Sequence, residues 1–158
     1  MSEACFEGMD NTNAIVKLCS AGMEAEGRGD SKGALELFTL AWDQSGNPWE
    51  SCIAAHYLAR HQPSLQGTLE WNLKALSLAR EVTDGSAIGF LPSLQLNVGH
   101  SYEMLGDYHE ARRQYDQAAD AATGLSEDGY GRFIRMGIEA GKRRIEENLY
   151  GIGEKKQQ

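Results

Sequence analysis

The chain has 158 residues, which is the size of one ordinary domain. Hydrophobic residues make up 41% and charged residues 24% of it, a balance typical of soluble globular proteins. The formal net charge of −8 repels phosphate backbones, and no apolar run approaches the roughly 18 residues that cross a bilayer. We therefore expect neither a nucleic-acid partner nor a membrane span.

The first ten residues and the cysteines favour a cytoplasmic protein. Acidic residues near the start do not match the basic and then apolar pattern of a secretory signal. The three cysteines, Cys5, Cys19 and Cys52, are an odd and widely spaced set, unlike the disulfide framework of a secreted protein. We expect them to be reduced thiols.

Glycine, proline and capping residues separate stretches of helical periodicity, and no stretch alternates apolar and polar residues as a strand does. The sequence predicts seven helices, at about 12–27, 31–45, 48–61, 65–82, a fifth that ends before Gly106, 108–122, and a last that ends near Leu149. The expected N-caps are Asn11 or Thr12 for the first helix, Asp30 for the second and Asn47 for the third. The predicted fold class is all-α.

The chain also repeats itself. One set of spaced residues is Gly22, Ala25, Gly29, Asp30, Ala34, Phe38 and Ala41. The same offsets recur in Gly99, Tyr102, Gly106, Asp107, Ala111, Tyr115 and Ala118, and a degenerate copy is Ala55, Leu58, Gln62, Pro63, Gly67 and Trp71. We expect the small residue that opens each set to let two helices approach closely. The aromatic residue near its end would wedge between one unit and the next.

These residues and spacings resemble the tetratricopeptide repeat, a helix-turn-helix unit of about 34 residues. The resemblance implies a right-handed superhelix of about three repeats plus a C-terminal capping helix, in a single domain over residues 1–150. The repeats would span about 15–47, 48–91 and 92–125, the capping helix about 127–149, and a polar tail 151–158. It also implies a concave groove lined by the first helix of each repeat.

The resemblance implies a non-enzymatic adaptor or scaffold that binds a peptide or helix of another protein in this groove. The expected groove residues are Val16, Cys19, Met23, Trp49, Cys52, His56, Arg60, Leu96, His100 and Glu103. Some members of the family bind acidic chaperone tails through a clamp of lysine, asparagine and arginine. Only Asn97 fits that clamp here, so we do not expect such a ligand. A self-associating homodimer, paired through the last helix or the long fourth helix, is the alternative.

Cys52 and His56 lie four residues apart, which is a workable spacing for metal ligands or for a thiol–imidazole pair. A structural zinc site normally needs four ligands, and an open groove supplies no evident oxyanion donors. We expect no metal, no cofactor and no catalytic residue.

Overall fold

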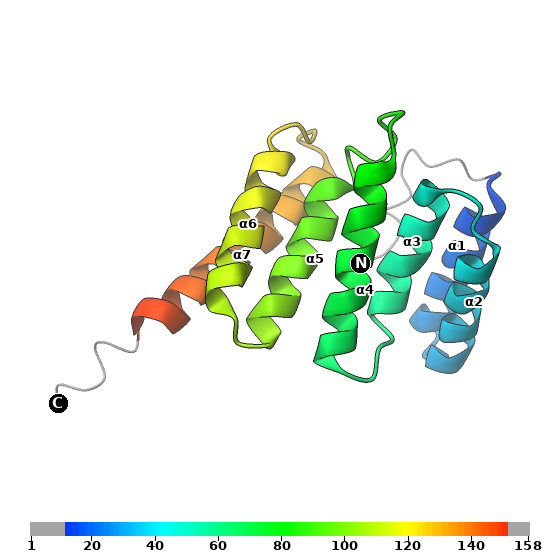
Figure 1. Ribbon diagram of the computed structural model, residues 1–158, viewed down its shortest axis with the longest axis horizontal. Helices are drawn as coiled ribbons and strands as arrows, with labels where there is room; N and C mark the ends of the chain where they lie inside the picture. The colour runs from blue at the N-terminus through cyan, green and yellow to red at the C-terminus, as the bar shows by residue number, and fades with distance from the viewer. Residues whose placement is uncertain (1–11, 152–158) are drawn as a thin grey trace. The chain divides into compact units, whose positions relative to one another are not determined.

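The computed structural model describes residues 12–151, which form seven helices and, within that range, no strand. In chain order these are α1 (Ala14–Gly27), α2 (Ser31–Gln44), α3 (Pro48–Ala59), α4 (Leu65–Glu81), α5 (Leu91–Met104), α6 (Tyr108–Ala122) and α7 (Gly129–Tyr150) (Figure 1). The predicted all-α class is confirmed. Residues 152–158 of the predicted polar tail lie outside the described range.

Side-chain caps start the helices close to where the sequence predicts them. The carboxylate of Asp30 accepts a hydrogen bond from the backbone nitrogen of Gly33 at 2.9 Å, and α2 begins at Ser31, the residue after Asp30. Asn47 caps α3 in the same way. The first helix differs from the prediction, because Asn13 is its cap: its Oδ1 accepts from the nitrogens of the two residues after Ala14. Of the two predicted caps, Thr12 is not used and Asn11 lies outside the described residues.

The chain divides into two compact units, one ending at Phe90 and the other starting at Leu91. The division falls where the sequence predicts the boundary between the second and third repeats. The single domain predicted over residues 1–150 stays a prediction.

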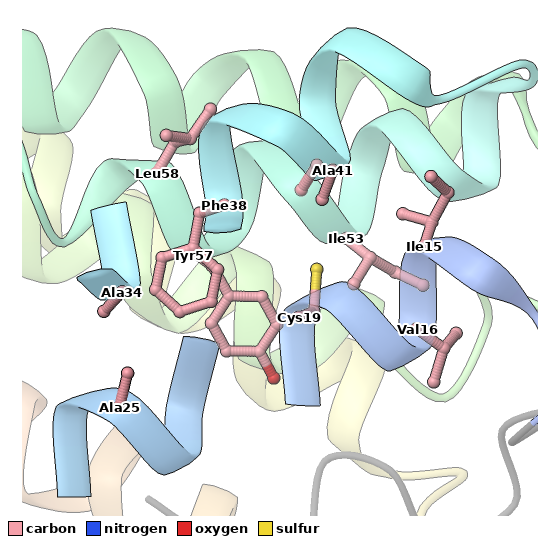
Figure 2. Packing of buried hydrophobic residues seen from close by; sticks show 11 residues of the cluster. Ile15, Val16, Cys19, Ala25, Ala34, Phe38, Ala41, Ile53, Tyr57 and Leu58 are labelled. Atoms are coloured by element: carbon pink, nitrogen blue, oxygen red, sulfur yellow. The ribbon is translucent and has the colours of Figure 1, made fainter. Parts of the chain in front are cut away.

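In the first unit, α1 pairs with α2 and α3 pairs with α4, and α3 also packs against both α1 and α2. The core between these helices is built around Phe38, which is fully buried. Its ring stacks on that of Tyr57, with centroids 5.0 Å apart and planes inclined by 13°. Figure 2 shows the two rings side by side among the aliphatic residues of the cluster.

In the second unit, α5 pairs with α6, and α7 packs against both. Tyr115 of α6 takes the place here that Phe38 takes in the first unit, and it is also fully buried. Ile134 and Ile138 of α7 form a second small cluster with Ala118 and Ala122 of α6. The last helix therefore lies on the hairpin before it as α3 lies on α1 and α2.

Glycine makes room for both aromatic rings. A Cβ atom on Gly22 would lie 2.3 Å from Cε1 of Phe38, and one on Gly99 would lie 2.9 Å from Cδ1 of Tyr115. Gly141 of α7 also approaches the Tyr115 ring, near its hydroxyl end, where a Cβ would lie 2.4 Å from Cζ. The close helix approach that the sequence predicts at the small residue is thus present at Gly22 and Gly99; the contact of each glycine with the aromatic ring of its own copy does not follow from the sequence analysis.

The degenerate copy is shifted by one residue from its predicted alignment. Phe38 and Tyr115 each stand eight residues after the N-cap of their helix, which is Asp30 and Asp107. The N-cap of α4 is Ser64, so the equivalent position is Asn72, which is buried. Trp71, which the sequence predicts there, is only partly buried. The cap fixes the phase of the helix, and the Gln62-Pro63 loop moves that cap by one residue.

Candidate interaction surfaces

Four of the predicted groove residues are buried in the first unit. Val16 and Cys19 of α1 lie in its core. Cys52 and His56 of α3 are buried as well, because α3 packs against α4 as well as α1 and α2. These four side chains offer no surface to a partner in this structure.

Cys52 and His56 are both buried, and His56 lies against two aromatic rings. The His56 ring meets the rings of Tyr57 and Phe90 edge-on, with centroids 4.9 and 5.1 Å away. Burial, assisted by the nearby positive charge of Arg60, lowers the pKa of His56 to about 3, so the imidazole is neutral at physiological pH. Burial raises the pKa of Cys52 to about 12, which keeps the thiol protonated and therefore a poor nucleophile.

The side chains of residues 12–151 form no candidate metal site. Nowhere in that range do three or more His, Cys, Asp or Glu side chains gather as a metal ion requires. Burial also raises the pKa of Cys19 to about 12, which makes this thiol a poor metal ligand.

The other three groove residues of the first unit take part in its internal contacts. Met23 and Trp49 are partly buried against the core, and the Trp49 ring meets Phe90 edge-on with centroids 5.8 Å apart. Arg60 forms an ion pair with Glu26, and its guanidinium lies 4.8 Å from the centroid of the Tyr57 ring. Arg60 is the most accessible of the seven groove residues predicted in this unit.

In the second unit, α7 packs against the predicted groove residues of α5. A Cβ atom on Gly137 would lie 3.0 Å from Cδ2 of Leu96, so the two helices are in close contact there. Glu103 accepts hydrogen bonds from Tyr115 Oη at 2.6 Å and from Arg144 Nε and Nη2 at 2.6 and 2.9 Å. Only His100 of the three stays well exposed, with its Nδ1 3.6 Å from the Glu103 carboxylate.

The Glu103 carboxylate anchors α7 electrostatically. Burial works to raise its pKa, but the hydrogen bonds from Arg144 and Tyr115 and the positive charge of Arg144 hold that pKa below its ordinary value. Burial, together with the hydrogen bond that its hydroxyl donates to Glu103, raises the pKa of Tyr115. The nearly buried Glu103 carboxylate of α5 thus accepts hydrogen bonds from three donor atoms, one on α6 and two on α7. These bonds fix the position of α7 on the hairpin of α5 and α6.

A surface that the groove prediction omits, with two exposed apolar residues, lies on the outward side of α7. Its inward side carries the buried residues Ile134, Ile138, Gly141 and Ile145. On the opposite side, Phe133 is 51% and Met136 72% exposed. Spacings of three and four residues continue this line along the helix, and we call it the α7 outer stripe: Phe133, Met136, Ala140, Arg143 and Glu147. This heptad-like spacing is the signal in the sequence that could have located it.

A smaller aromatic surface joins α2 and α4. The rings of Trp42 and Trp71 meet edge-on with centroids 5.0 Å apart. The ammonium group of Lys74 lies 5.2 Å from the centroid of the Trp42 ring and 4.6 Å from that of the Trp71 ring, so both rings form cation–π contacts within the chain. This surface is therefore already occupied by the chain's own cation.

Comparisons of the chain with protein-family models, with curated proteins and with solved structures found no match. Among the described helices, none combines the length and the apolar character that crossing a membrane requires.

Proposed function

We propose that the protein is a non-enzymatic interaction module of the tetratricopeptide type, a cytoplasmic adaptor or scaffold. Its hairpins would continue in a right-handed superhelix, as the resemblance implies. Support comes from the glycine–aromatic contacts of Phe38 and Tyr115, and from the way α3 and α7 each lie on the preceding hairpin.

The observation that carries the proposal is the exposure of the α7 outer stripe. The helix in the corresponding place of the first unit, α3, is covered by α4, whereas Phe133 and Met136 of α7 are open to solvent. Full burial of such a side chain contributes about 1.5–3 kcal/mol. Covering the exposed parts of both would therefore contribute about 2–4 kcal/mol to binding, which makes them natural anchors.

The partner is a polypeptide with an amphipathic helix, because a stripe spaced by three and four residues is complementary to another helix. The mixed charge of the stripe, one arginine and one glutamate, does not favour a polyanionic chaperone tail. We assign binding to this stripe rather than to the predicted groove, since most of the groove residues are engaged inside their own units.

The test is affinity capture from native extract with the immobilised full chain and with a Phe133→Glu/Met136→Glu variant. Lys32→Glu is the matched control, because Lys32 is an exposed residue of α2. We expect a defined set of proteins, which includes the chain itself if it self-associates, to be retained by the wild type and the control and lost by the double variant. Retention of the same proteins by all three would reject the stripe as the binding surface.

A further inference from the structure

We propose that the α7 outer stripe pairs with the same stripe of a second copy, with the two α7 helices antiparallel. This inference rests on the proposed function, since it names the polypeptide that covers the stripe. The evidence is the charge pattern of α7, which favours an antiparallel pair, together with the length of helix overlap, which favours one register.

A parallel pair is unfavourable because it sets identical residues against each other. Arg143 would face Arg143 of the second copy, and Glu147 would face Glu147. The helix dipoles would also be aligned in the same direction. In an antiparallel pair each residue meets a different one, and the dipoles oppose each other favourably.

Among the antiparallel registers that match stripe to stripe, the one with the longest overlap of the two α7 helices also buries both exposed apolar residues. It sets Met136 opposite Ala140 of the second copy, and Phe133 opposite Arg143 of the second copy. A small residue then receives the flexible methionine, and a guanidinium lies over an aromatic ring, which is an attractive cation–π pair.

The flanking charges agree with this register. Arg132 and Glu146 are both exposed and lie on the same flank of the stripe, so that Arg132 of each copy lies beside Glu146 of the other. Glu147 falls near Gly129, the first residue of the opposite α7, where the carboxylate of Asp128 already caps the helix by accepting from the nitrogen of Gly131, so this contact is not an attractive one. Two Arg132–Glu146 ion pairs and two Phe133–Arg143 cation–π pairs are the attractive contacts of this register, and the repulsion between the two Glu139 side chains near the two-fold axis opposes them.

The register seven residues in one direction sets Met136 opposite Phe133 and Arg132 beside Glu139, but the two helices then overlap only over residues 129–140. The register seven residues in the other direction is worse in its contacts. It would place Glu139 beside Glu146 of the second copy twice, and Met136 opposite Glu147. It would also draw on Tyr150, whose hydroxyl accepts a hydrogen bond from Arg112 at 3.1 Å within the same chain. The preferred register uses five stripe positions per copy, which makes an interface at the small end of specific interfaces. We expect a dissociation constant of about 10 µM.

The experiment is sedimentation velocity on the full chain across a concentration series around that value. Arg132→Glu and Glu146→Arg each place like charges together across the interface, and each alone should raise the dissociation constant at least about tenfold. An equimolar mixture of the two single variants should form a heterodimer as stable as the wild-type dimer, because each new charge then meets its opposite. Circular dichroism controls the folding of each variant, and Lys32→Glu should leave dimerisation unchanged.

The direction of pairing has its own test. In a Cys5→Ser background, a mixture of Met136→Cys and Ala140→Cys chains should crosslink on mild oxidation, and either chain alone should crosslink much less. Crosslinking of Ala140→Cys alone, at the level of the mixture, would show a parallel pair and overturn the register.

A wild-type chain that stays monomeric at every concentration overturns this inference. Dimers that persist unchanged in both single variants overturn it too, because they would use another surface. The proposed function has a separate outcome. If the wild-type chain is monomeric but captures other proteins, and the Phe133→Glu/Met136→Glu variant no longer captures them, the self-pairing is refuted and the proposed function is retained.

Discussion

Replacing Gly22 by alanine should destabilise the first unit even though alanine is the better helix former. The new Cβ atom would lie 2.3, 2.7 and 2.8 Å from three ring atoms of Phe38. The ring cannot move aside freely, because it is fully buried and stacked on Tyr57. Overpacking of this kind costs about 1–3 kcal/mol.

Helix propensity works in the opposite direction, since alanine in a helix is favoured over glycine by about 1 kcal/mol. We therefore expect a net loss of about 1–2 kcal/mol in the free energy of unfolding. For a chain of this length that corresponds to a fall of about 2–8 °C in melting temperature. The assay is urea denaturation followed by circular dichroism.

The matched control is Gly27→Ala in the same helix, where a Cβ would meet no atom within 4 Å. It should be neutral or slightly stabilising, because only the propensity changes. Replacing the ring by a smaller side chain relieves the clash, so the Gly22→Ala/Phe38→Leu double variant should lose less free energy of unfolding than the sum of the losses of the two single variants. Equal stability of Gly22→Ala and Gly27→Ala would refute the close contact between α1 and α2.

Three further outcomes are expected. Gly99→Leu should lower the free energy of unfolding by about 3 kcal/mol, because a large side chain enters the contact with Tyr115; unchanged thermal unfolding would contradict the packing. Trp49→Ala should destabilise the first unit by about 2 kcal/mol, since the ring packs on Phe90 and the core; unaltered denaturation would show that the ring does not pack there. Stability should also fall by about 2 kcal/mol from about pH 7 to about pH 5, because burial lowers the pKa of His56 to about 3 while the unfolded imidazole takes up a proton below about 6.5. The unfolded state then binds more protons than the folded state, so acid favours unfolding; a His56→Gln variant with the same pH dependence would contradict this.

Local signals in the sequence were sufficient for the helices. Capping residues such as Asp30 and Asn47 occupy fixed places relative to the apolar periodicity, and the helices start where these caps stand. The close approach of two helices at Gly99 could be predicted because two copies share the same offsets, whereas its contact with the Tyr115 ring is seen only in the structure. In the degenerate copy the predicted alignment is wrong by one residue, because the cap at Ser64 sets the phase of α4 and places Asn72, not Trp71, at the buried position.

The surface was harder to predict, because burial depends on every element that packs against a helix. Cys52 and His56 have the spacing of an exposed helical face, yet α3 is enclosed on several sides. Glu103 could be placed in a groove from the repeat pattern, but its ion pair with Arg144 joins residues far apart in the sequence. Phe133 and Met136 were assigned to the last helix, while their exposure follows only from which side of that helix is buried.

The most direct measurement is photo-crosslinking from within the α7 outer stripe. A benzophenone amino acid would replace Met136 in the full chain, and Ile88, an exposed apolar residue outside the helices, would serve as the control position. We expect irradiation in cells to attach a second polypeptide at position 136 and not at position 88. Equal labelling at the two positions, or no polypeptide attached at position 136, would contradict the account.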